Sequence, residues 1–341
     1  MTEREVLRYL VHRIVLLVPM LFGIVVAVFA LLALAPGDPA VVFLGENATP
    51  EAVSELRRNL GLDRPWPLRL ARYAGGILTG DMGVSIFRRE PVSTMILDRL
   101  PATLELALAA IAFAAVAGLA LGILAALKQG SLADLAVMAF AELGVSMPVF
   151  WLGILLTAFF AVRFDWFPAV GRGEPLISAV GLALGGRPQA LANSLSHLFL
   201  PALTLGLGLA AVLSRLVRAS LLETLHEDYV RSARARGLRA GRVLLGHALR
   251  NALLPVVSVL GVRFGILLGG SVLTESIFGW PGLGQLAVTA ISQRDLPLVQ
   301  GIVLVFASTF LVLHLIVDLG YGVLDPRVRL DGGGASSTAG E

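Results

Sequence analysis

Long apolar runs constrain this chain more than any other feature, because about 20 apolar residues suffice for a helix to cross a bilayer. Six mainly apolar runs occur, at residues 14–37, 101–127, 135–162, 198–213, 253–274 and 298–321. Charged residues make up 15% of the chain, whereas about 25% is usual in a soluble domain. We therefore expect an all-α integral membrane protein with six transmembrane helices.

The first apolar run has a second interpretation as a signal peptide, because Ala33-Leu34-Ala35 resembles a cleavage site. The apolar part of a signal peptide has about 7–15 residues. The charge-free run from Ile14 to Gly37 is longer than that. We therefore expect an uncleaved first transmembrane helix.

An even number of spans places both termini on the same side of the membrane. The N-terminus, the loop at Lys128, the loop at 223–252 and the tail then share one side, and they hold the basic excess among the short segments. Basic short loops indicate the cytoplasm. We expect four parts: a cytoplasmic N-terminus with the first helix (1–36), an extracytoplasmic segment (37–100), a five-helix core (101–322) and a cytoplasmic tail (323–341).

The loop at residues 223–252 lies within the most basic stretch between two spans, and we name it the coupling loop. Leu222, Leu225, Tyr229 and Ala233 recur at helical spacing before Gly237, which can adopt the positive φ that ends a helix. A second amphipathic run follows, with apolar residues at Leu245, Ala248, Leu249, Ala252 and Leu253. The pattern predicts two short helices joined at a glycine and held against the membrane as a docking element.

Residues 229–238 (YVRSARARGL) and 247–255 (HALRNALLP) resemble the cytoplasmic EAA loop of permease subunits of ATP-binding-cassette (ABC) importers. The peptide and nickel branch of that family typically reads Y-V-R-S/T-A-R-A-K-G-L and then H-A-L-R/K-N-A-L-L-P. Arg231 and Ser232 occupy the first two positions of the general E-A-A-x-x-x-G pattern, as is usual in that branch. The resemblance extends to residues 36–39, 80–85, 99–106, 278–284 and 325–327.

The resemblance implies a type I ABC importer permease, which forms half of a pore for di- or oligopeptides or for a related solute such as a nickel chelate. Its partners would be a second permease subunit, two cytoplasmic ATP-binding subunits, an extracytoplasmic solute-binding protein and the lipids of a bacterial cytoplasmic membrane, without nucleic acid. ATP and Mg²⁺ would bind to the partners, so this chain would be neither an enzyme nor a cofactor carrier. The residues expected to contact the ATPase are Tyr229, Arg231, Ala233, Arg234, Ala235, Gly237 and Leu238.

Ionisable residues inside spans are costly and suggest function. Arg263 lies about 18 Å into the fifth span at 1.5 Å per residue, where it could face the pathway or pair with Glu142 or with an acid of the partner subunit. Glu275 at the outer end of that span could line a gate, cap a helix or form a local pair. We expect Arg263, Glu275 and Glu142 to lie along the translocation path.

His314 and Asp318 suggest an alternative, because they lie one helical turn apart in the sixth span and could relay a proton. In that interpretation the chain is a proton-coupled secondary transporter. An intramembrane enzyme is a third class, but the sequence has no cysteine, no G-x-S-x-G, no H-E-x-x-H and no phosphate-binding G-x-x-x-x-G-K-S/T. We expect no catalytic residue and no metal site.

Overall fold

The computed structural model describes residues 3–34, 38–45 and 48–324, and every regular element in this part of the chain is a helix. The prediction of an all-α protein is confirmed. The expected tail motif at 325–327 and the side chain of Asp318 lie outside the described residues. In chain order the α-helices are α1 (Glu3–Leu34), α2 (Pro39–Leu44), α3 (Pro50–Leu60), α4 (Trp66–Leu78), α5 (Val92–Leu127), α6 (Leu132–Ser146), α7 (Val149–Leu156), α8 (Leu176–Leu184), α9 (Pro188–His226), α10 (Asp228–Ala235), α11 (Ala240–Val243), α12 (Leu249–Ala252), α13 (Leu254–Ile277), α14 (Leu283–Gln293) and α15 (Leu296–Leu324), with π-helices η1 (Thr157–Arg163) and η2 (Leu244–Ala248).

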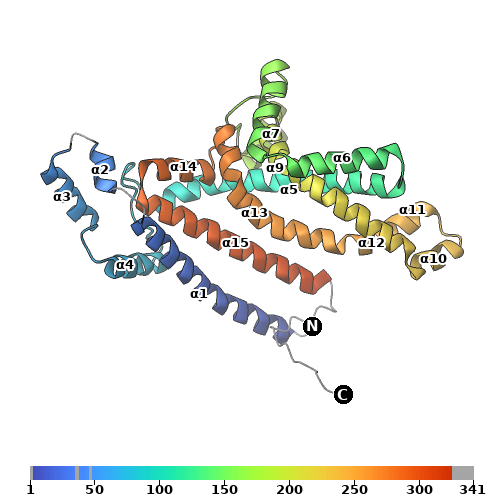
Figure 1. The fold of residues 1–341 in the computed structure, drawn as a ribbon, viewed down its shortest axis with the longest axis horizontal. Coiled ribbons are helices and arrows are strands. Elements are labelled where there is room, and N and C mark those ends of the chain that lie inside the picture. Colours follow the sequence, from blue (N-terminus) through green and yellow to red (C-terminus); the bar gives the residue numbers. More distant parts are fainter. Residues whose placement is uncertain (1–2, 35–37, 46–47, 325–341) are drawn as a thin grey trace.

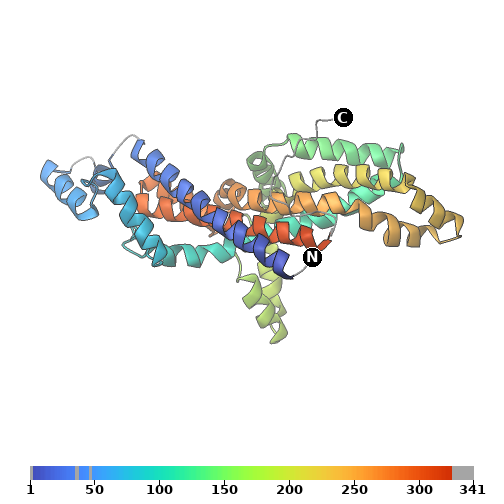
Figure 2. The ribbon, with the colours of Figure 1, turned by 90° about the horizontal axis from the view of Figure 1, so that it is seen from below.

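The long helices α5, α13 and α15 run alongside one another, and α1 packs on α15 (Figures 1 and 2). The short helices α2–α4 lie at one end of this bundle, and α10–α12 lie at the opposite end in both views. The segment 37–100 and the coupling loop are therefore separated by the length of the long helices.

Glycines bring α5 and α9 close together. A Cβ atom on Gly118 of α5 would lie 2.6 Å from the Cβ of Leu213, and one on Gly122 would lie 2.7 Å from the backbone oxygen of Ser214. On α9, a Cβ on Gly206 would lie 2.7 Å from the backbone oxygen of Ala110. Membrane helices approach closely where small residues face each other, so these glycines determine how near the two helices lie.

Three helices are long and apolar enough to span a membrane alone: α5, α9 and residues Leu296–Ile316 of α15. Two further spans arise if α6 with α7–η1, and α11–α12 with α13, each count as one bent span. The described apolar stretch of α1, Val15–Ala30, is shorter. These findings make the chain an integral membrane protein, and the count of six spans stays a prediction.

Two helices begin earlier than the apolar runs indicate. The second run was expected to open at Pro101, but α5 begins at Val92 and contains Pro101; α9 likewise contains Pro201. A helix tolerates proline in a membrane protein when neighbouring groups compensate the lost hydrogen bond. Pro148 interrupts the third apolar run, and α6 and α7–η1 meet there at 109°.

The segment 37–100 folds locally as its turn residues predict. Thr49 caps α3, with its Oγ1 accepting from Ala52 N (3.3 Å), and Pro50 occupies the first turn. Gly61 ends α3 in the left-handed conformation at φ 66°. The connection between the fifth and sixth apolar runs contains α14, and only its first residues after Phe278 carry turn signals.

Candidate functional site

The coupling loop forms a compact helical unit at one end of the bundle (Figure 1). α9 ends at His226, Glu227 takes an extended conformation, and α10 begins at Asp228. At the other end of α10, Gly237 has φ 76°. Gly237 N donates to Arg234 O (2.9 Å) and Leu238 N donates to Ala233 O (3.4 Å). This pair of bonds is a Schellman motif, so Gly237 ends the first helix as the sequence predicts.

The direction of the apolar stripe differs from the prediction. The stripe was expected to present Tyr229 and Ala233 to a partner, but α10 buries Val230 and Ala233 inside the chain. They pack in one apolar cluster with Leu221 of α9 and with Val243, Ala248 and Ala252. The break at Glu227 rotates α10 relative to α9, so a stripe read as one continuous helix cannot predict the buried face.

The second half of the loop also differs from one regular helix. It divides into α11, η2 and α12, and it buries Val243, Ala248 and Ala252 while Leu245 is 66% exposed. A π-helix bonds residue i to i+5 instead of i+4. The extra residue per turn moves Leu245 off the buried face to which a regular helical spacing assigned it.

The outward face of α10 is polar and basic. Its exposed residues include Tyr229, whose hydroxyl accepts from Asn251 Nδ2 (2.8 Å) and so joins α10 to α12. Arg231 lies 3.4 Å from Asp228 in a largely exposed pair, which stabilises the loop little. Arg234 and Arg236 form no ion pair with any described residue. This face can donate charge-assisted hydrogen bonds to an acidic protein surface.

An ion pair that the sequence did not reveal lies near the coupling loop. Arg218 on α9 donates from Nε to Asp134 Oδ1 (2.6 Å) and from Nη2 to Asp134 Oδ2 (2.8 Å). Asp134 Oδ2 also accepts from Gly130 N (3.0 Å). The bidentate contact ties the connection between α5 and α6 to α9. Because the partners lie far apart in the chain, residue spacing gives no signal of it.

Glu275, an expected path residue, is fully buried. Its Oε1 accepts from Thr103 Oγ1 (2.8 Å) and Ser271 Oγ (3.0 Å), and its Oε2 accepts from Gln285 N (3.0 Å). Thr103 Oγ1 in turn accepts from Leu283 N (2.8 Å). Within the described chain this carboxylate therefore joins α5 and α13 to the start of α14.

The loop after α13 is further held by Trp280 and Arg172. Trp280 Nε1 donates to Ala102 O (2.9 Å), and the Arg172 guanidinium lies 5.5 Å from the centroid of the Trp280 ring. Arg172 also pairs with Glu105 of α5. The loop from Phe278 to Gly284 is thus anchored to α5 by buried polar contacts.

A second buried acid, Asp295, has a role that the sequence pattern does not indicate. Its carboxylate accepts from the hydroxyl of Ser85 and, more weakly, from Ile86 N (3.3 Å) and Phe87 N (3.4 Å). The loop before α5 is thereby tied to the connection between α14 and α15. An isolated aspartate after a helix carries no spacing signal that could have identified this role.

Arg263 and Glu142 do not pair with each other. Glu142 Oε2 lies 3.1 Å from Arg215 Nη1, and Glu142 is 70% exposed. Arg263 is exposed and forms no ion pair or hydrogen bond with any described residue. The alternative in which Glu142 neutralises Arg263 is therefore wrong, while a position on the translocation path stays a prediction for both residues.

His314 stacks on Phe310 in α15, with ring centroids 5.9 Å apart. No described acid contacts it, and the side chain of Asp318 lies outside the described residues. The proposed proton relay therefore has no described contact to carry it.

Two family models together match most of the chain. Residues 118–330 match the binding-protein-dependent transport system inner membrane component, and residues 6–107 match the N-terminal part of such membrane components. The chain belongs to this family. The first match includes the coupling loop, so the resemblance of the chain is confirmed at the level of the family. The family consists of membrane components and not of catalytic subunits.

Curated relatives match over nearly their full length. The chain is 41% identical over 331 residues to a dipeptide transport system permease protein of Alkalihalophilus pseudofirmus, covering 95% of this chain and 99% of the relative. It is 43% identical to a di/tripeptide transport system permease protein of Pseudomonas aeruginosa, with the same coverage. A glutathione transport system permease protein of Pectobacterium atrosepticum is 39% identical, again covering 95% and 99%. None of these relatives is described as a proton-coupled carrier.

Two solved structures share the fold. A chain of the MetNI methionine ABC transporter in an inward-facing conformation aligns with a TM-score of 0.53 at 17% identity, covering 68% of this chain and 96% of that chain. A chain of an amino acid ABC transporter with histidines aligns with a TM-score of 0.50 at 15% identity, covering 67% and 93%. The chain therefore shares the fold of these two ABC transporter chains.

Proposed function

We propose that this chain is the permease subunit of an ATP-driven importer and forms half of a translocation pathway for short peptides. The observation that carries the proposal is the identity of about two residues in five, over 95% of the chain, to permeases named for dipeptide or di/tripeptide transport. Glutathione, named for a third relative, is itself a tripeptide. Dipeptides and tripeptides are therefore the substrate class to test first.

The proposed topology has six spans with both termini in the cytoplasm of a bacterium, and the chain lies in the inner membrane. Five spans come from the candidate helices, and α1 supplies the sixth. Reporter fusions after Lys128 and after Arg242 should report the cytoplasm, whereas fusions near Leu60 and near Pro188 should report the outer side. A cytoplasmic signal near Leu60 would contradict this topology.

The proposed assembly contains a second permease, two cytoplasmic ATPase subunits that bind ATP and Mg²⁺, and an extracytoplasmic binding protein. The exposed basic face of α10 supports contact with an ATPase, because unpaired arginines on a folded helical unit favour an acidic partner surface. Arg263 supports a pathway or subunit interface on one side of α13. An exposed and unpaired arginine in a span does not face lipid, since the charge is costly there.

Uptake in proteoliposomes tests the proposal. The chain would be purified with its co-expressed partner subunits and reconstituted with its binding protein, and labelled dipeptide uptake would be measured with ATP or with an imposed proton gradient. We expect uptake that requires ATP and the binding protein and that persists when the proton gradient is collapsed. Uptake driven by the proton gradient alone would refute the proposal and restore the proton-coupled alternative.

A further inference from the structure

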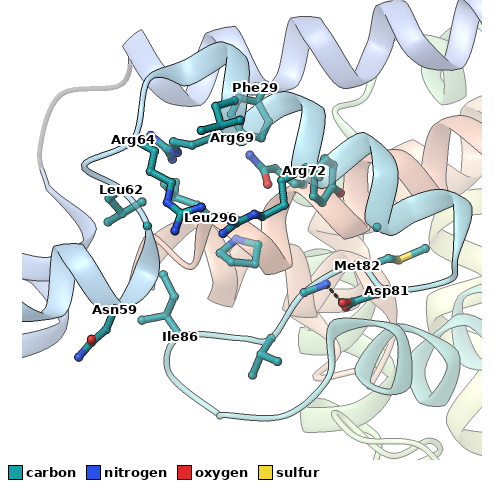
Figure 3. Close-up of a pocket in the computed structure, with 18 residues that line it drawn as sticks. Phe29, Asn59, Leu62, Arg64, Arg69, Arg72, Asp81, Met82, Ile86 and Leu296 are labelled. Atoms are coloured by element: carbon teal, nitrogen blue, oxygen red, sulfur yellow. Dashed lines mark hydrogen bonds between the residues drawn. The ribbon is translucent and has the colours of Figure 1, made fainter.

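A pocket lies where the segment 37–100 meets the transmembrane helices, far from the coupling loop. Its volume is about 360 Å³, and its walls come from four separate parts of the chain (Figure 3). α1 contributes Phe29, and the start of α15 contributes Leu296, Pro297 and Gln300. The remaining walls are the residues from Asn59 through α4 and the loop 81–86. None of the functions assigned above uses this pocket.

Three arginines give the pocket an excess of positive charge. Arg64, Arg69 and Arg72 line it and lie on the side near Phe29 in Figure 3. None of them forms an ion pair or a side-chain hydrogen bond with a described residue, and Arg69 lies 5.6 Å from the ring centroid of Phe29. The one carboxylate among the lining residues belongs to Asp81, and its Oδ1 accepts from Gly83 N (2.8 Å).

Tyr73 adds a hydrogen-bond donor that has no partner. Its hydroxyl oxygen is buried and makes no hydrogen bond in the described chain. Burial raises the pKa of Tyr73 to about 12, so the phenol is neutral and can donate at physiological pH. A buried polar group without a partner is destabilising. The oxygen is inaccessible to solvent, so an acceptor bound in the pocket satisfies it only after a shift of the Tyr73 side chain.

The pocket opens where the membrane surface is expected. Leu296 begins the part of α15 that is apolar enough to span, so its neighbours lie at the membrane boundary. α4 combines two of the pocket arginines, Arg69 and Arg72, with exposed apolar residues, among them Trp66 (52% exposed), Leu68 (53%) and Leu78 (89%). Tryptophan and apolar residues on one helix with arginines are typical of a helix that lies in the lipid interface.

We propose that this pocket binds the phosphate of an anionic phospholipid from the leaflet that contacts the segment 37–100. The three guanidinium groups and the Tyr73 hydroxyl donate to the phosphate oxygens, and arginine suits phosphate because it donates two bonds in one plane. The lipid's apolar part lies along Leu68 and the apolar wall formed by Phe29 and Leu296. Lipid bound there would connect α4 to α1 and α15 independently of the transported substrate.

Native mass spectrometry of the purified full-length complex tests the site, with dioleoylphosphatidylglycerol as the probe and dioleoylphosphatidylcholine as the zwitterionic comparison. The test variant replaces Arg64, Arg69 and Arg72 with Gln. The matched control replaces three exposed arginines of the same segment outside the pocket, Arg58, Arg88 and Arg89, so both proteins lose the same charge. A third arm adds millimolar inorganic phosphate to the wild type.

We expect phosphatidylglycerol binding in the wild type and the control, and about a hundredfold weaker binding in the test variant, since several charge-assisted bonds are lost. Equal binding by the test variant and the control would overturn the proposal. Retention of phosphatidylcholine equal to that of phosphatidylglycerol would also overturn it. So would displacement of the lipid by inorganic phosphate, because the site would then be one for a soluble anion. If the test variant keeps its lipid binding but the binding protein no longer stimulates ATP hydrolysis, the pocket is instead a docking site for an acidic protein segment.

Two single variants keep the test decisive if the triple variant does not fold. Arg64→Gln changes an exposed side chain that forms no side-chain hydrogen bond or ion pair with a described residue, and it should weaken phosphatidylglycerol binding about tenfold. Tyr73→Phe removes the unpartnered hydroxyl. It should leave folding intact and weaken phosphatidylglycerol binding. Unchanged binding in both variants would overturn the proposal.

Discussion

Replacing Gly237 should uncouple the coupling loop from transport without unfolding the protein. Gly237 has φ 76°, and a Cβ atom added there would meet no atom within 4 Å. The cost of a side chain is therefore backbone strain and not a clash. For an L-residue in the left-handed region, that strain is about 1–2 kcal/mol.

This strain is comparable with what holds the loop in place. The Schellman motif contributes two hydrogen bonds, Gly237 N to Arg234 O and Leu238 N to Ala233 O, each stabilising by about 0.5–1.5 kcal/mol. Leu238 also packs against the cluster that contains Ala233. A shift of about 1–2 kcal/mol changes the ratio of two conformations about 5- to 30-fold. Gly237→Ala should populate an open loop measurably, and Gly237→Val, whose β-branched side chain tolerates this φ still less, should abolish coupling.

The assay is peptide-stimulated ATP hydrolysis and dipeptide uptake in proteoliposomes that contain the partner subunits. Gly130 provides a matched control, because it also has φ 76°, would place an added Cβ atom more than 4 Å from any neighbour, and lies in the connection between α5 and α6. Gly130→Val should carry the same strain and retain stimulation and uptake. Membrane insertion and docking of the binding protein should be unchanged in both variants. Retained stimulation and uptake in Gly237→Val would refute the reasoning and leave the loop as a basic anchor.

Three further predictions concern other parts of the structure. Glu275→Gln keeps an acceptor for Gln285 N and can donate to the Thr103 and Ser271 hydroxyls, so peptide uptake should stay near wild type. Glu275→Ala should lower the free energy of unfolding by about 1–3 kcal/mol for each donor left unpaired. A large change of peptide charge preference in Glu275→Gln would instead support a gate at this position. Gly122→Ala should destabilise the folded protein by about 1–3 kcal/mol through overpacking. The control Gly23→Ala should not, because no atom lies within 4 Å of the added Cβ. Equal unfolding temperatures of the two variants would contradict the close packing of α5 on α9. Arg263→Gln should assemble normally and change which peptide charges are transported, and loss of the folded complex would show that Arg263 pairs with an acid of another subunit.

Local signals in the sequence were sufficient for the long helices and for some of the helix ends. The apolar runs predict α5, α13 and α15 because a membrane span requires a minimum number of apolar residues whatever surrounds it. Thr49 and Gly61 predict the ends of α3, and Gly237 predicts the end of α10, because a side-chain cap and a positive φ depend on neighbouring residues only. The family resemblance likewise rests on contiguous residues.

The coupling loop shows where local reasoning stops. Its helices and its glycine were predicted, but its buried face was not, since the break at Glu227 and the π-helix η2 both change the register of the buried residues. A periodicity argument assumes one uninterrupted helix. Neither the break nor the π-helix has a residue signature strong enough to show this from the sequence.

The sequence by itself determined an all-helical membrane protein, its family and the conformation at Gly237, because each depends on composition or on residues within about one helical turn. Only the tertiary structure decided the partners of Glu275, Asp295 and Arg218 and the assembly of the pocket around Tyr73. Those contacts join residues that are distant in the chain, so they depend on how close the helices lie. That distance is set by side-chain packing, such as the approach of α5 and α9 at Gly122, which no pattern along the chain records.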